Sequence, residues 1–137
     1  MTIAAAPASA LLLECVIGDA RSADAPATWH VALWDADPRL GGSAELTSAG
    51  GYARAALSNA SSGWASLSSV ATSQPVAFPQ PTGAWSAAGL WLSLHVSVTD
   101  PVPYFPQQLD TPVVVSSASD PAPQVQVTCC FAYPGIS

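Results

Sequence analysis

The sequence contains no lysine, and three arginines are its only permanent cations. Charged residues make up 9% of its 137 residues, and the formal net charge is −6. Nucleic-acid binding depends on cations that neutralise phosphates, so we expect no nucleic-acid partner. The same shortage of positive charge argues against an anionic membrane surface, and we expect no membrane partner.

Long apolar runs are also missing. The apolar run at residues 10–17 is interrupted by Glu14 and is too short to cross a bilayer. No basic residues precede it, so it is a poor signal peptide. Residues 1–7 are small and mostly apolar, and we predict that they form an N-terminal arm.

Cysteine is scarce, and its spacing fits no metal site. Cys15, Cys129 and Cys130 make an odd count, and the adjacent pair would point to opposite faces of a strand. A disulfide between neighbours would be strained. We therefore predict three reduced, partly buried thiols in a protein made in a cytoplasm.

Turn-forming residues are abundant, and they determine the predicted fold class. Thirteen prolines and nine glycines argue against long helices. Strand-like runs recur at short spacing, at residues 28–35, 51–57, 64–72, 75–79, 88–98, 111–115 and 124–133. We predict an all-β fold, a β-sandwich or jelly-roll-like single domain over residues 8–137, with one short N-terminal helix at residues 8–17. No internal repeat is present that could build a long fibre shaft.

The stretch 28–57 contains the most informative strand. Trp29, Val31 and Leu33 alternate with His30, Ala32 and Trp34, so apolar bulk lies on both faces. This pattern predicts a central strand. The sequence Asp35-Ala-Asp37-Pro ends the strand, because proline cannot extend a central strand.

Arg54 is the most informative charged residue. It lies in the apolar segment that follows Tyr52, where a guanidinium needs carboxylate or carbonyl partners. Asp35, Asp37 and Glu45 are the candidate partners, in the same chain or in a neighbour. The alternative is an edge-strand arginine that faces solvent.

The same residues allow few catalytic or metal-binding interpretations. Asp35, Asp37 and Glu45 could approach Ca²⁺, but Asp-x-Asp-Pro is more often a turn that binds backbone N–H groups. A serine hydrolase would need a nucleophile elbow, which the sequence lacks. We expect no catalytic residues, no metal and no cofactor. Tyr52, Arg54, Asp35, Asp37, Glu45 and Trp34 are instead candidate structural or interface residues.

The chain resembles a family of small tailed-bacteriophage virion proteins, described as tail-fibre-like or head-decoration-like. The resemblance rests on a short apolar opening helix, a Pro26-Ala-Thr step into a strand that ends at Asp37-Pro38, a loop with Glu45, and the sequence Gly50-Gly-Tyr-Ala-Arg54. It implies an all-β virion component, a homotrimer without enzymatic activity.

We interpret the chain as a capsid decoration (cement) protein that would bridge subunits of the major capsid protein. A compact length and the missing shaft favour this interpretation. The alternative is a tail fibre, baseplate or minor tail component that could contact the host. In either case we expect a location in the virion, after assembly in the cytoplasm of a host bacterium.

Overall fold

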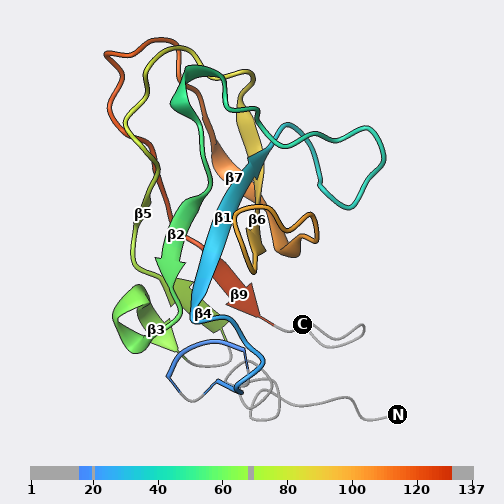
Figure 1. The fold of residues 1–137 in the computed structure, drawn as a ribbon, viewed down its shortest axis with the longest axis vertical. Coiled ribbons are helices and arrows are strands. Elements are labelled where there is room, and N and C mark those ends of the chain that lie inside the picture. Colours follow the sequence, from blue (N-terminus) through green and yellow to red (C-terminus); the bar gives the residue numbers. More distant parts are fainter. Residues whose placement is uncertain (1–15, 20, 68–69, 131–137) are drawn as a thin grey trace.

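The computed structural model describes residues 16–19, 21–67 and 70–130, and its strands pair in antiparallel sheets (Figure 1). The elements in chain order are β1 (Thr28–Trp34), η1 (Ala49–Gly51), β2 (Ala55–Ser58), η2 (Ser61–Gly63), β3 (Trp64–Leu67), β4 (Val70–Ser73), β5 (Val76–Ala77), β6 (Gly89–His95), β7 (Tyr104–Val113), β8 (Gln124–Val125) and β9 (Thr128–Cys130). The predicted all-β single domain is confirmed. The predicted arm and most of the predicted helix at residues 8–17 lie outside the described residues, and residues 16–19 form a turn.

The largest sheet has the strand order β2-β1-β6-β7. β1 is central as predicted, and it pairs with β2 on one side and β6 on the other. Its odd-numbered side chains Trp29, Val31 and Leu33 are at most 3% exposed. The opposite face of β1 carries His30 and Trp34, which are half-buried. Both faces of this strand are therefore covered, as the sequence pattern indicates.

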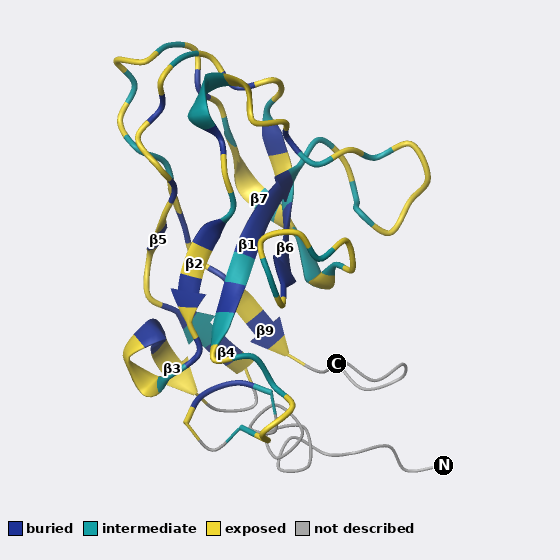
Figure 2. Cartoon of the chain, viewed as in Figure 1, coloured by how far each residue is buried: buried dark blue, intermediate teal, exposed yellow. Residues whose placement is uncertain are grey.

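Two smaller sheets complete the core. One has the order β3-β4-β9, and the other pairs β5 with β8. All three sheets contribute side chains to one hydrophobic cluster, which Figure 2 shows as the buried centre of the molecule. The members of this cluster include Trp29, Val31, Leu33, Tyr52, Leu57, Trp64, Val76, Phe78, Trp85, Leu92, Leu94 and Val127. Sheets that share one core are typical of layered all-β folds; the jelly-roll connectivity stays a prediction.

Several of the predicted strands differ in extent from the observed ones. The run 64–72 is two strands, β3 and β4, that pair antiparallel. The run that begins at Gly51 becomes a strand only at Ala55, because Gly50 and Gly51 adopt positive φ in the η1 turn. The closing run divides into β8 and β9.

β7 was predicted only for residues 111–115, but it spans ten residues and forms an edge of the largest sheet. Pro106 and Pro112 argued against a strand here, because proline has no N–H to donate to a neighbouring strand. Proline is tolerated on edge strands, which is where β7 lies. The pairing with β6 shifts register twice. Prolines and irregular pairing on an edge strand oppose the addition of another strand.

Adjacent cysteines lie on opposite sides of β9. Cys129 is buried and Cys130 is exposed, and both are free thiols, so the predicted partial burial does not hold for Cys130. Burial raises the pKa of the Cys129 thiol. Cys15 lies outside the described residues. Within the described ranges, no helix has the length and apolar character needed to cross a membrane.

Candidate functional site

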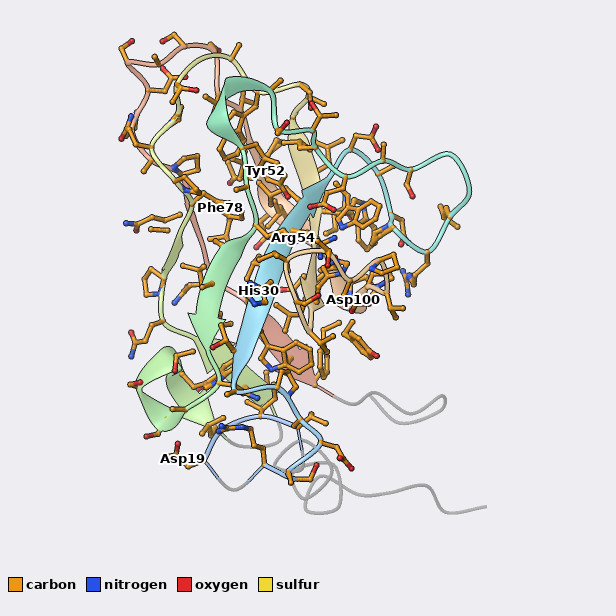
Figure 3. All side chains as sticks on the ribbon, viewed as in Figure 1. Asp19, His30, Tyr52, Arg54, Phe78 and Asp100 are labelled. Carbon is orange, nitrogen blue, oxygen red and sulfur yellow. The ribbon has the colours of Figure 1, made fainter. Side chains whose placement is uncertain are left out.

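Arg54 joins three segments that are far apart in the sequence. Its Nη2 and Nε donate to the two carboxylate oxygens of Glu45 at 2.8 and 3.0 Å. Its Nη1 donates to the carbonyl oxygens of Ser97 and Asp100 at 2.9 and 2.7 Å. In Figure 3, Arg54 lies between Tyr52 and Asp100. The Arg54 side chain is only 8% exposed, so the solvent-facing alternative does not hold.

Glu45 is held from a second direction by Tyr52. The Tyr52 hydroxyl donates to Glu45 Oε2 at 2.9 Å and accepts the backbone N–H of Leu33 at 2.9 Å. Glu45 also forms a backbone bridge with Trp34 at the end of β1. Burial raises the pKa of the Tyr52 phenol, so the hydroxyl keeps its proton and remains a donor. The loop after β1 is therefore tied to the central strand by side chains.

The two glycines before Tyr52 allow the backbone to reach this position. Gly50 has φ +68° and Gly51 has φ +81°, a backbone region that residues other than glycine rarely adopt. A Cβ added at Gly50 would lie 2.3 Å from the carbonyl oxygen of Ala84. The carbonyl of Gly50 accepts the N–H of Thr82 at 2.9 Å. Only glycine permits this approach of two backbones.

The Tyr52 ring extends the same unit into the core. It packs edge-on against Trp85 at 5.3 Å between ring centroids and stacks with Phe78 at 6.2 Å. Phe78 and Trp85 contact each other at 5.9 Å. Tyr52 therefore combines a hydroxyl in the polar network with a ring in the aromatic cluster, a dual role typical of buried tyrosines.

A second set of hydrogen-bonded side chains lies on the face of β1 and β6 that points away from the hydrophobic cluster. Trp34 Nε1 donates to the Ser93 hydroxyl at 2.8 Å, and Ser93 Oγ lies 2.7 Å from His95 Nε2. The indole can only donate, so the serine oxygen accepts from it, and the direction of the bond between Ser93 and His95 depends on the histidine tautomer. Trp34 also stacks on the His95 ring at 6.2 Å.

Both histidines lie on this same face, since His30 of β1 is the register partner of His95 of β6. Burial lowers the pKa of His95, and the Arg54 guanidinium lowers it further. Asp100 and Glu45 act in the opposite direction but do not reverse the shift. Burial and Arg54 also lower the pKa of His30. Both rings are therefore neutral near pH 7.

The two aspartates after β1 have separate partners. Asp35 Oδ1 accepts the N–H of Ala44 at 2.8 Å, which closes the loop. The carboxylate of Asp37 accepts from the Arg39 side chain at 2.7 Å, and these bonds lower the pKa of Asp37. The Asp-x-Asp-Pro sequence is thus a hydrogen-bonded turn. Among the described residues, no group of three or more histidines, cysteines or carboxylates could hold a metal ion.

An apolar groove of about 340 Å³ opens beside the turn between β6 and β7. Pro26, Trp29, Val96, Tyr104 and Phe105 contribute to its walls. Trp29 packs against the rings of Tyr104 and Phe105 at 5.8 and 6.2 Å. No local sequence pattern indicates this groove, because its walls come from segments about seventy residues apart.

A family model described as "Podophage GP4 fiber I protein gp80" matches residues 4–113. The chain belongs to this family. The matched range contains Glu45, Tyr52 and Arg54 and ends at the last residue of β7. No curated protein and no solved structure matched the chain. The protein is therefore a structural component of a bacteriophage virion, and membership of a fibre family fits the tail-fibre alternative better than capsid decoration.

The structure brings the six candidate residues into two groups. Glu45, Tyr52 and Arg54 form one hydrogen-bonded unit, and the backbone of Trp34 joins it through Glu45. Asp35 and Asp37 hold the loop that leads to Glu45. Sequence reasoning missed His95, Ser93 and the carbonyls of Ser97 and Asp100. A signal existed only for the histidine, whose position inside an apolar strand indicated burial.

Proposed function

We propose that this chain is a structural subunit of a podophage tail fibre. The match of a podophage fibre family over residues 4–113 carries the proposal. Capsid decoration has no comparable support, and contact with the major capsid protein stays a prediction of that interpretation alone.

The proposed role is mechanical and not catalytic. Ser93 and His95 are the pair that most resembles a nucleophile and its base, but each is 0% exposed. Ser93 also accepts from the indole of Trp34, which lies against the His95 ring. A substrate would have to displace this tryptophan to reach the serine. The polar network is better explained as a connection between the loop after β1, the segment before β2 and the turn after β6.

We also propose that the subunit is a homotrimer that needs no cofactor and is assembled in the host cytoplasm. All three arginines donate within the chain: Arg21 to Gly18 and Asn59, Arg39 to Asp37, and Arg54 to Glu45. Little positive charge remains for an acidic partner such as nucleic acid. Contacts between copies would therefore depend on apolar and uncharged polar surface.

Labelling of intact virions tests the proposal. An antibody against the purified chain, visualised by electron microscopy, should mark fibres at the tail and leave the head shell unlabelled. Quantitative mass spectrometry of the same virions should give a copy number far below that of the major capsid protein. Uniform labelling of the head, with a copy number comparable to that of the capsid protein, would contradict the fibre role.

A further inference from the structure

β9 is the outermost strand of the sheet β3-β4-β9. It pairs with β4 on one side, and its Thr128 and Cys130 are exposed while Cys129 is buried. In an antiparallel pair, the N–H and C=O groups of every second residue point away from the partner strand. At the outer edge of a sheet, such groups are a template for pairing with a strand of another molecule. This edge of β9 therefore has to be occupied if the chain is to avoid such pairing.

One side chain of β7 occupies the outer edge of β9. Gln107 Nε2 donates to the carbonyl oxygen of Thr128 at 2.8 Å, and Gln107 Oε1 accepts the N–H of Thr128 at 3.0 Å. A side-chain amide offers the same donor and acceptor as a peptide group. These two bonds are therefore the ones that a residue of a neighbouring strand would make. Gln107 Nε2 also donates to the carbonyl oxygen of Phe105 at 3.1 Å, which fixes the orientation of the amide.

The backbone of β7 is distorted just before Gln107. Phe105 has φ +51°, and among the described residues it is the only one other than glycine with positive φ. The pairing with β6 changes register here, since Gln107 lies opposite Leu92 but Tyr104 lies opposite Leu94. β7 thus contains one residue more than β6 in this interval, which is a bulge, and bulges redirect side chains. Strained residues cluster at positions where the backbone has to present a particular side chain.

The register of β7 explains why Gln107, and not its neighbour, reaches β9. Opposed residues of an antiparallel pair lie on the same face of the sheet. Gln107 lies opposite Leu92, which is 0% exposed, so its side chain points to the core side, where the second sheet lies. Gln108 is exposed and lies opposite Trp91, so its side chain points to the other face. The chain therefore contains a neighbouring glutamine that serves as a control for the first.

We propose that the Gln107 amide is an autoinhibitory contact, which occupies the outer edge of β9 and prevents β9 of a second copy from pairing there. Two copies of the same edge can pair antiparallel about a two-fold axis, because each supplies the N–H and C=O groups that the other needs. Prolines protect the β7 edge of the largest sheet, and Gln107 protects the β9 edge of the second sheet. The inference does not depend on the fibre role or on the trimer, since it concerns an association that the wild-type chain avoids.

Sedimentation of the full-length chain over a range of concentrations tests the contact. Gln107→Ala frees both backbone groups of Thr128, so self-association should strengthen at least about tenfold over the wild type. Gln108→Ala is the matched control and should sediment like the wild type. Gln107→Glu also loses the donor to the Thr128 carbonyl, but a charged side chain at a sheet edge opposes strand pairing. This variant should therefore lose stability as Gln107→Ala does in urea unfolding, without any increase in association.

A double variant identifies the edge through which association occurs. Thr128→Pro in the Gln107→Ala background removes the N–H that points away from β4, and it should return association to the wild-type level. Unchanged sedimentation of Gln107→Ala would overturn the inference. Equal association of Gln107→Ala and Gln107→Glu would assign the effect to lost stability and would overturn it as well. Association that persists in the double variant would place the contact elsewhere than on β9, with the same consequence.

Discussion

Replacement of the buried Arg54 by alanine should destabilise the fold far more than replacement of the exposed Arg39. The guanidinium makes four hydrogen bonds, two to Glu45 and one each to the carbonyls of Ser97 and Asp100. Alanine removes all four donors. The Glu45 carboxylate then keeps the hydrogen bond from the Tyr52 hydroxyl, and the carbonyls of Ser97 and Asp100 lose the donor that Arg54 supplied.

The magnitude follows from burial. Removal of one partner from a buried ion pair costs about 3–5 kcal/mol, because the other charge is left without compensation. The Glu45 side chain is 22% exposed, so water can take over part of this compensation, and the lower end applies. We expect a loss of about 3 kcal/mol in the free energy of unfolding. For a chain of this size that corresponds to a fall of about 10 °C in Tm.

Urea unfolding at pH 7.5 measures the effect. Arg39→Ala is the matched control, because Arg39 also pairs with a carboxylate, that of Asp37, but its side chain is 61% exposed and should contribute little to stability. Arg54→Lys should be intermediate, since an ammonium cannot form the two-pronged contact with Glu45. If Arg54→Ala and Arg39→Ala unfold at the same urea concentration, the network does not stabilise the fold as argued.

Three further substitutions test other parts of the same region. Gly50→Ala should lower the free energy of unfolding by at least about 2 kcal/mol, because the residue has positive φ and its Cβ would meet the carbonyl of Ala84. Gly42→Ala, which has positive φ but open space around it, should lower it by only about 1–2 kcal/mol, and thermal melts compare the two variants. Tyr52→Phe should cost about 1–3 kcal/mol, because the buried N–H of Leu33 loses its acceptor, and it should leave the aromatic cluster intact by near-ultraviolet circular dichroism. His95 has a folded-state pKa below its unfolded value, so its protonation favours the unfolded chain and stability should fall as the pH drops below about 6.5. A His95→Gln variant should show a shallower decline between pH 7.5 and 5, with the remainder due to His30, and an unchanged slope would contradict the assignment.

The sequence was most informative where local pattern and tertiary environment agree. Alternation in β1 predicted its central position, because a strand with apolar residues on both faces has to be covered on both. The Asp35-Ala-Asp37-Pro turn was predicted from the preference of short carboxylates for nearby N–H groups, and both carboxylates make such bonds. The need of Arg54 for a partner was likewise predictable from its apolar surroundings.

The sequence was less informative where distant segments decide the structure. Which of three carboxylates pairs with Arg54 depends on how the loop 35–46 folds back, and its two carbonyl partners lie more than forty residues away. The predicted length of β7 was too short because its prolines are tolerated only at a sheet edge, and a strand's edge position depends on how the whole sheet assembles. The apolar groove joins residues 16–29 to residues 96–105 and has no local pattern.

Virions that lack this protein test the central claim most directly. A fibre subunit contributes to host attachment and not to the strength of the shell. Phage assembled without the chain should therefore package DNA and retain it through osmotic shock, but should lose a fibre density at the tail and adsorb poorly to host cells. Virions that adsorb normally but leak DNA under osmotic shock would contradict the account and restore capsid decoration.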